Sequence, residues 1–374
     1  MGGWRVRGRA VLTAALLRAT LATAATTVEP IARLSLEGGY DSNVLLDGHS
    51  EDQVVRFAPD VGLRLRDHHL DLAATYGGEL LWYERLAPQG VWNQRGALTL
   101  DTRLDRRTSL GGDLRVWQAF DPAQLAQAGV FRVGGQRALL AFGHARLEWH
   151  ADRIDSVALT FLERTVLFDD RTGGAMHAPG VEVIRRVDER LALGAAYAFG
   201  AYTSFLPGED EHATSHGVRL IARWRATRHL AIEAWAGPAL WLPEGSASAI
   251  VPEGFLQGLV ATRGLDLRVS VGHALGLGAT AQPGIVDSAE VGLEKRWGRS
   301  WFLRGDGGLW HSGLVPTGEG AVTGYAAAAE AGLILHGGLR LSLRGAHYGR
   351  ADAMVPQYQR TTLGLRVAWE LQPR

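Results

Sequence analysis

Eight short polar turns recur along the chain, and each is followed by a run that alternates apolar with polar residues. The turns lie near Asp67, Asp105, Asp152, Asp188, Thr227, Arg263, Gly298 and Gly337, in steps of 38, 47, 36, 39, 36, 35 and 39 residues. A period of about 37 residues has room for two strands and two connections. The spacing predicts a series of hairpins with short turns at one end and longer loops at the other. That arrangement is typical of outer-membrane β-barrels.

The clearest alternating segment lies near the C-terminal end of the chain. Its apolar face carries Leu363, Leu365, Val367, Trp369 and Leu371. About nine to eleven alternating residues are what a tilted strand needs to cross the hydrocarbon of a membrane. Soluble sheets also alternate, but their strands usually span only about five or six residues. Strand length therefore favours a transmembrane barrel over a soluble β-sandwich.

The tryptophans cluster near the ends of the predicted strands. Near the short turns or the C-terminus lie Trp149, Trp224, Trp297, Trp301 and Trp369. Near the longer loops lie Trp82, Trp92, Trp117, Trp241 and Trp310, and Trp235 is close to a strand centre. Indole rings favour membrane–water interfaces, so this distribution predicts two aromatic girdles, one at each interface.

The turns also give the number of strands. One strand, about Ile31–Tyr40, precedes the first hairpin pair, and one, about Gln357–Leu371, follows the last. The fold class is therefore all-β: an antiparallel up-and-down transmembrane barrel of about 18 strands, with both termini in the periplasm. Sixteen strands is the alternative, because residues 133–151 and 176–187 alternate less regularly. Closure of the sheet would satisfy every backbone hydrogen bond in lipid.

Longer loops are expected at the external ends of the strands. We place them near residues 41–52, 86–90, 121–133, 168–178, 203–213, 243–251, 280–284, 316–322 and 351–356. The composition of 121–133 is compatible with a short helix. None of these loops is long enough to form a folded domain.

The N-terminal residues have the pattern of a secretory signal peptide. Arg5, Arg7 and Arg9 precede an apolar stretch from Ala10 to Leu21, which is followed by an A-x-A site. The apolar stretch is too short to span a bilayer. We expect residues 1–24 to be the signal peptide, cleaved after Ala24 or Ala25, and residues 25–374 to form the barrel.

Charge and cysteine content exclude several other classes of protein. The chain has no cysteine, which excludes a disulfide scaffold and a lipid attached to an N-terminal cysteine. Without the four arginines of residues 1–24, 35 basic residues face 39 acidic ones, a net charge of −4. This balance argues against nucleic acid as a partner. The remaining sequence has no apolar run of about 18 residues, which argues against transmembrane helices.

The chain offers little that resembles an enzyme. A barrel hydrolase needs a serine and a histidine within hydrogen-bonding reach of each other. Ser215 and His216 are neighbours in sequence, but on a strand their side chains would point to opposite faces. Sequence motifs of other hydrolases and of phosphate-binding loops are missing as well. We therefore expect no catalytic residues, no cofactor and no metal site.

The polar faces of the strands supply candidates for the lining of a lumen. They are Arg115, Arg219, Arg223, Arg225, Glu233, Trp235, Asp266, Arg268, Arg304, Asp306, Arg340, Arg344, Tyr348 and Arg366. The mixture of signs predicts cross-strand ion pairs and a wet lumen without strong ion selectivity. Inward aromatic residues, Tyr83, Trp117 and Trp310 among them, are compatible with a stacking track for sugar rings or with simple packing.

One short segment resembles a known family. Gly39 is followed by Tyr40, Asp41, Ser42, Asn43 and Val44 at the end of the first strand. This Y-D-S-N-V segment resembles the 18-stranded outer-membrane barrels of surface-polysaccharide and exopolysaccharide export systems. The resemblance implies a conduit for the polysaccharide chain that cooperates with a periplasmic polysaccharide-export protein.

The last strand also resembles the assembly signal of outer-membrane proteins. Gly364, Val367 and Trp369 fit the pattern G-x-x-Φ-x-Φ, in which Φ is an apolar residue. The chain departs from the usual form because residues 370–374 follow the aromatic residue. The pattern implies recognition by the barrel-assembly machinery and insertion among outer-membrane lipid in a Gram-negative bacterium.

Three functions are compatible with this sequence. The first is a non-enzymatic channel that exports a secreted or surface polysaccharide, which the Y-D-S-N-V segment favours. The alternatives are a general diffusion or nutrient porin and a barrel that anchors surface partners. Fold alone does not choose among them.

Overall fold

The structure is a computed structural model, and it describes residues 26–44, 50–85, 91–120, 137–206, 210–278, 281–315, 321–352 and 358–371. The predicted signal peptide and the predicted helix at 121–133 lie outside these residues. Among the described residues, no helix is long and apolar enough to cross a membrane.

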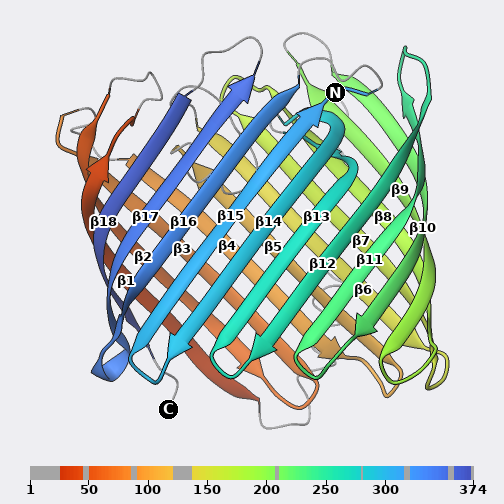
Figure 1. Cartoon of the computed structure of the whole chain (residues 1–374), viewed down its shortest axis with the longest axis horizontal. Helices are drawn as coiled ribbons and strands as arrows, with labels where there is room; N and C mark the ends of the chain where they lie inside the picture. The colour runs from red at the N-terminus through yellow and green to blue at the C-terminus, as the bar shows by residue number, and fades with distance from the viewer. Residues whose placement is uncertain are drawn as a thin grey trace, which may run out of the picture.

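The described residues form one sheet of 18 antiparallel strands that closes into a barrel (Figure 1). The strands are β1 (Thr27–Asp41), β2 (Asp52–Arg66), β3 (Leu70–Tyr83), β4 (Val91–Arg103), β5 (Thr108–Ala119), β6 (Ala138–His150), β7 (Asp155–Phe168), β8 (Gly173–Arg186), β9 (Leu191–Phe205), β10 (Glu211–Arg225), β11 (Leu230–Pro243), β12 (Ala249–Thr262), β13 (Leu265–Leu277), β14 (Pro283–Trp297), β15 (Trp301–Gly313), β16 (Val322–Ile334), β17 (Leu339–Asp352) and β18 (Tyr358–Glu370). Each strand pairs with its neighbours in sequence, and β1 pairs with both β2 and β18. The prediction of 18 strands is confirmed, and the alternative of 16 is wrong.

The short turns lie at all eight predicted places, and five of them share one construction. In the first, Asp67 Oδ1 accepts hydrogen bonds from the backbone N–H groups of His69 and Leu70, at 2.7 and 2.8 Å. Asp105, Asp152, Asp188 and Thr227 repeat this pattern with a side-chain oxygen. The backbone hydrogen bonds from His69 and Leu70 lower the pKa of Asp67, because they favour its charged form. These side chains supply the local partners that a tight turn needs.

Two of the predicted external loops are much shorter than expected. Within the segment 168–178, only residues 169–172 lie between strands, and within 203–213 only residues 206–210 do. All four residues from Gly173 to Met176 are buried, on both faces of the strand, and none of them is charged. The apolar–polar alternation that marks the other strands is therefore missing from this segment. Strand β8 therefore begins earlier than the pattern indicated.

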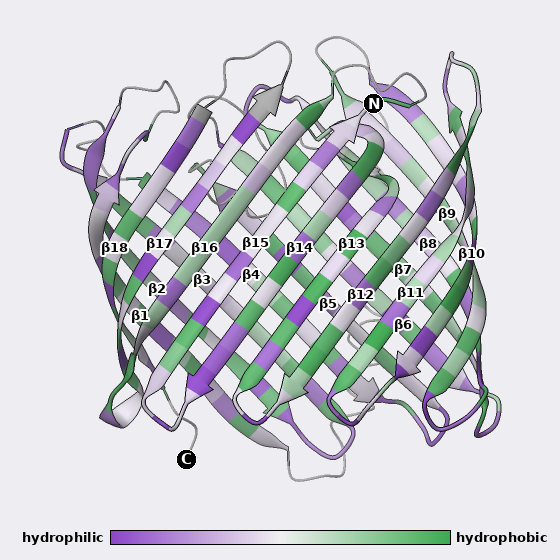
Figure 2. Cartoon of the chain, in the orientation of Figure 1, coloured by the Kyte–Doolittle hydropathy of each residue, from purple (hydrophilic) through white to green (hydrophobic). Residues whose placement is uncertain are grey.

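Hydrophobic and hydrophilic residues alternate along the strands in Figure 2, and the exposed apolar side chains face outward. The predicted girdle beside the short turns is confirmed. Its tryptophans, Trp149, Trp224, Trp297, Trp301 and Trp369, are between 40% and 57% exposed. A barrel with an apolar exterior is stable in a lipid bilayer, and the protein is an outer-membrane β-barrel.

The predicted girdle at the external end is only partly correct. Trp82 and Trp92 are exposed on the outer surface. Trp117, Trp241 and Trp310 occupy the inward register: Trp241 is buried against Tyr202, and Trp310 Nε1 donates to Glu290 at 3.3 Å. The inward position predicted for Trp117 and Trp310 is therefore confirmed, whereas their place in a girdle, with that of Trp241, is wrong, because sequence distance from a strand end gives the height of a side chain but not its face.

Candidate functional site

The external end of the β13–β14 hairpin packs against the inner surface of the barrel wall and occupies one side of the lumen. Leu275 and Leu277 of β13 pack with Met176, Tyr202 and Trp241 of the surrounding wall. These contacts lie on the inner surface of strands that are several positions away around the barrel. The hairpin therefore narrows the lumen near its external mouth.

Ala281, just before β14, marks how far the hairpin reaches. It is fully buried and packs against Ala119, Leu140 and Phe168, on the inner surface of β5, β6 and β7. A Cβ atom at Gly174 of β8 would clash with the carbonyl oxygen of Ala281. The glycine thus provides the space in which the tip of the hairpin seats.

A chain of polar and aromatic contacts holds the base of the hairpin. Glu253 Oε1 accepts a hydrogen bond from the backbone N–H of Leu275 at 3.0 Å, and its Oε2 pairs with Arg219 at 2.8 Å. The Arg219 guanidinium lies 4.0 Å from the ring centroid of Trp235, which stacks on Phe255. Because the Glu253 side chain is almost fully buried, these partners compensate for the loss of its hydration.

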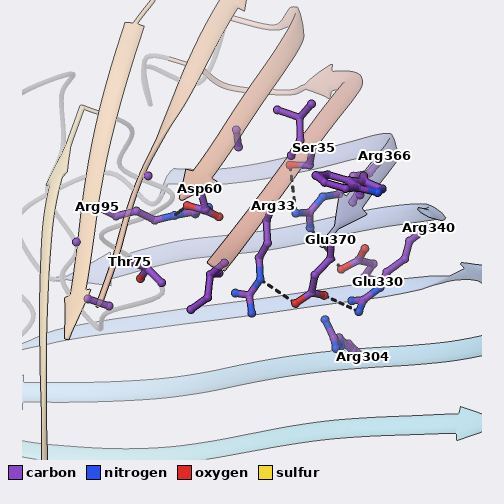
Figure 3. Close-up of a pocket in the computed structure, with 18 of the residues that line it drawn as sticks. Arg33, Ser35, Asp60, Thr75, Arg95, Arg304, Glu330, Arg340, Arg366 and Glu370 are labelled. Atoms are coloured by element: carbon purple, nitrogen blue, oxygen red, sulfur yellow. Dashed lines mark hydrogen bonds and ion pairs between the residues drawn. The ribbon is translucent and has the colours of Figure 1, made fainter. Parts of the chain in front are cut away.

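The half of the lumen that the hairpin leaves open contains a cavity of about 660 Å³, bounded by β1–β5 and β14–β18 (Figure 3). Seven arginines line it: Arg33, Arg95, Arg115, Arg296, Arg304, Arg340 and Arg366. Only three carboxylates do so, those of Asp60, Glu330 and Glu370. Two further carboxylates pair with these arginines from outside the lining: Glu294 with Arg296 and Arg304, and Asp113 with Arg115. With these two counted, the seven guanidinium groups exceed the carboxylates by two positive charges.

Ion pairs fix the positions of several of these arginines, as the dashed lines in Figure 3 show for Glu370. Glu370 bridges two strands, with Arg33 at 3.0 Å and Arg340 at 2.8 Å. Arg95 pairs with Asp60 at 2.6 Å. Sharing one carboxylate between two guanidinium groups holds both in place without neutralising them, so the surface stays electropositive.

A second cavity of about 470 Å³ adjoins the first, and the two share Arg95, Arg115 and Trp117. Its lining adds Arg268, Asp306 and Arg344, and it ends against Ala119 and Leu140, where the hairpin tip packs. The polar part of the lumen therefore continues toward the external mouth beside the hairpin.

The predicted lining residues separate into several groups in the structure. Arg115, Arg304, Arg340 and Arg366 line the first cavity, and Arg268, Asp306 and Arg344 line the second. Arg223, Arg225 and Glu233 line a third cavity of about 490 Å³ beside the short turns. Arg219 and Trp235 support the hairpin, Tyr348 is buried beside Arg360, and Asp266 pairs in register with Glu294.

Sequence reasoning missed several residues of the first cavity: Arg33, Asp60, Arg95, Arg296 and Glu330. All of them lie on inward faces that the alternation could have revealed. The contact of Arg95 with Asp60 spans the intervening strand β3, because Gly77 leaves room for the Asp60 side chain. The sequence signal for this pair is the inward Gly77 on β3, which lies between Asp60 on β2 and Arg95 on β4.

The Y-D-S-N-V segment closes the seam between β1 and β18. The side chains of Asp41 and Arg360 are fully buried and form a bidentate ion pair, with Nε to Oδ1 at 2.7 Å. The Asn43 amide donates to the carbonyl oxygen of Gln359 at 3.0 Å, and the Thr361 N–H donates to Ser42 Oγ at 2.8 Å. The segment therefore has a structural role at the point where the first and last strands meet.

The remaining candidates offer no catalytic arrangement. Ser215 faces Tyr202 inside the barrel, whereas His216 contacts Tyr197 on the outside, so the prediction that they point to opposite faces is confirmed. Among the described residues, no group of three or more His, Asp or Glu side chains could hold a metal ion. In the assembly-signal pattern, Val367 and Trp369 face outward and Gly364 packs against Glu37.

The chain matches no family model and no curated protein sequence. Its structure is similar to those of Pseudomonas aeruginosa OccK5 (OpdH), with 12% identity, a TM-score of 0.42 and coverage of 92% of this chain and 99% of that one. It is also similar to OccK7 (OpdD) of the same species, at 11% identity, TM-score 0.45 and coverage of 93% and 99%. A third is P. aeruginosa OccK2 (OpdF) in complex with glucuronate, at 11% identity, TM-score 0.42 and coverage of 92% and 99%.

Neither the family models nor the curated sequences support the expected resemblance to polysaccharide-export barrels. A closed antiparallel barrel with an apolar exterior and a polar interior that contains cavities is an outer-membrane barrel channel.

Proposed function

We propose that the protein is a passive channel through which small, polar, anionic solutes diffuse across the outer membrane. The observation that carries this proposal is the lining of the first cavity, with seven arginines against three carboxylates. A water-filled passage with an electropositive wall raises the local concentration of anions and lowers that of cations. This proposal replaces the expectation of weak ion selectivity.

The inward hairpin supports transport of small solutes rather than export of a polymer. It fills the side of the lumen bounded by β5–β13 near the external mouth and leaves the cavities along the opposite wall. A hydrated polysaccharide needs a wide and continuous lumen, whereas a small solute needs only a path beside the hairpin. The nutrient-porin alternative is therefore the better proposal.

The arginine pairs suit weak and reversible contacts. Because Glu370 holds Arg33 and Arg340 in fixed orientations, a passing anion meets preorganised N–H donors. Conduction requires that binding be favourable enough for entry and weak enough for release. No covalent step is needed, and we propose that the channel is not an enzyme.

Ion selectivity in planar bilayers tests this proposal. Under a salt gradient, the reversal potential of the wild-type channel is expected to show a preference for chloride over potassium. Replacing Arg33 and Arg340 by Gln leaves Glu370 without its two partners and should shift the preference toward cations. Arg228→Gln, in a short turn, removes the same kind of charge outside the cavity lining and should change little. A cation-selective wild type, or equal effects of both changes, would refute the proposal.

A further inference from the structure

The outer surface of the barrel carries a belt of histidines near the external ends of the strands. We define the histidine belt as His177, His212, His216, His273, His311 and His347. Each lies one to five residues from the external end of its strand, in register with apolar residues that face the lipid. Their side chains therefore point away from the lumen, toward whatever surrounds the barrel.

Each belt histidine contacts a polar side chain on a neighbouring strand through Nδ1. The partner is a carboxylate at two positions: Glu163 for His177, and Asp287 for His273 at 2.6 Å. At the others it is a hydroxyl: Thr203 for His212, Tyr197 for His216, Thr323 for His311 and Thr361 for His347. The belt is thus built of paired groups rather than isolated histidines.

The hairpin of β7 and β8 shows the height of the belt in the membrane. The pair Glu163–His177 lies above the outward residues Phe161, Leu159 and Val157, and below them Arg185 pairs with Asp155 at 3.1 Å. The eight steps from 155 to 163 on a tilted strand span roughly 20 Å, close to the apolar band of about 25 Å in such barrels. Charged pairs therefore flank the hydrocarbon on both sides, and the belt lies at the level of the outer-leaflet headgroups.

The β13–β14 hairpin gives the same height independently. The pair His273–Asp287 lies above Val271 and Val269, and Lys295 and Trp297 lie at the lower end of β14. Both carboxylate pairs are accessible from outside: the side chain of His177 is 51% exposed and that of His273 is 41% exposed. The two pairs therefore present carboxylate-bound imidazoles on the surface that faces the membrane.

The neighbours of His177 and His273 determine which ring nitrogen of each histidine is free to bind a ligand. His177 is flanked by Glu163 on β7 and by Ala201 on β9, and His273 by Gly254 on β12 and Asp287 on β14. The carboxylate accepts from Nδ1–H, so in the neutral ring Nε2 carries no proton. A protonated imidazole carries a second, charge-assisted donor at Nε2–H, and on these outward side chains that donor is directed away from the lumen.

We propose that the histidine belt binds the phosphate groups of the phosphorylated glycolipid of the outer leaflet, through Nε2–H of His177 and His273, and binds them more tightly as the pH falls. Phosphate oxygens are strong acceptors for charged donors, and the belt lies where the headgroups are. Below the belt, the outward face of this hairpin carries only apolar residues as far as the Arg185–Asp155 pair, so the acyl chains have a matching surface. This inference does not depend on what passes through the lumen.

Native mass spectrometry of the full barrel, released from nanodiscs, tests the proposal. The nanodiscs contain equal amounts of bisphosphorylated lipid A and its dephosphorylated form, and spectra are compared at about pH 5.5 and about pH 8. The test variant is His177→Gln with His273→Gln, and the control is His68→Gln, an exposed histidine in a short turn. Heat-modifiable migration on a gel verifies that each variant is folded.

The wild type and the control are expected to retain the bisphosphorylated lipid about tenfold better at the lower pH, the ratio for about 1.4 kcal/mol. The double variant should lose this dependence on pH. Equal retention of both lipids by the wild type, or an unchanged preference in the double variant, would overturn the proposal. So would a belt covered by a second copy of the chain, seen as an oligomer that dissociates in the double variant.

Discussion

Replacement of Asp41 by Ala should destabilise the barrel more than any change on its surface. Arg360 would keep its charge in a site where its side chain is fully buried and would lose both carboxylate oxygens. Removing one partner of a buried ion pair costs about 3–5 kcal/mol, because the other charge is left without compensation. This loss of stability affects the pairing of β1 with β18, and the barrel needs that pairing to close.

The assay is urea unfolding of the protein refolded into lipid vesicles, followed by the fluorescence of the outward tryptophans. The double variant Asp41→Leu with Arg360→Met removes both charges and should be more stable than Asp41→Ala alone. Asp101→Ala, an exposed carboxylate on β4, is the control and should change stability by less than about 0.5 kcal/mol. A loss below about 1 kcal/mol for Asp41→Ala, or strictly additive effects in the double variant, would refute the role of the pair.

Three further predictions concern the turns and the hairpin. Turn donors lower the pKa of Asp105, so its contribution to stability is present above the unfolded value of about 3.9 and is lost as the pH falls below it. Asp105→Thr, which copies the turn at Thr227, should keep the turn but weaken the acid dependence of unfolding. Gly174→Ala should expel the hairpin tip and raise single-channel conductance, whereas Gly38→Ala, with open space around its Cβ, should not. Glu253→Gln should loosen the base of the hairpin and increase current noise; unchanged noise would contradict its anchoring role.

The strands could be predicted from the sequence because each one is a local pattern. Alternation gives the two faces, and the short turns at Asp67 and its seven counterparts give the spacing, so the strand count follows. Even the separation of Ser215 from His216 needed only the period of a strand. These features depend on neighbours in sequence, which is the range over which residue patterns are informative.

The arrangement inside the lumen could not be predicted in the same way. An inward residue has the same pattern whether it faces water or a folded-in hairpin, so the alternation does not predict that Trp241 is buried against Leu275 and Leu277. The burial of Ala281 against β5–β7 depends on contacts across the barrel. The same holds for Asp41 and Arg360, which are 319 residues apart and meet only when the barrel closes. A short motif that serves closure was therefore interpreted as a sign of polysaccharide export.

Rates of solute entry into proteoliposomes test the central claim most directly. Swelling is measured for vesicles that contain the purified barrel and are placed in isotonic solutions of a small carboxylate, a neutral sugar of matched size and a small cationic solute. The arginine-lined cavity predicts that the carboxylate enters fastest and the cation slowest. Absence of swelling in all three solutions, or entry of the cation at the same rate as the carboxylate or faster, would contradict the account.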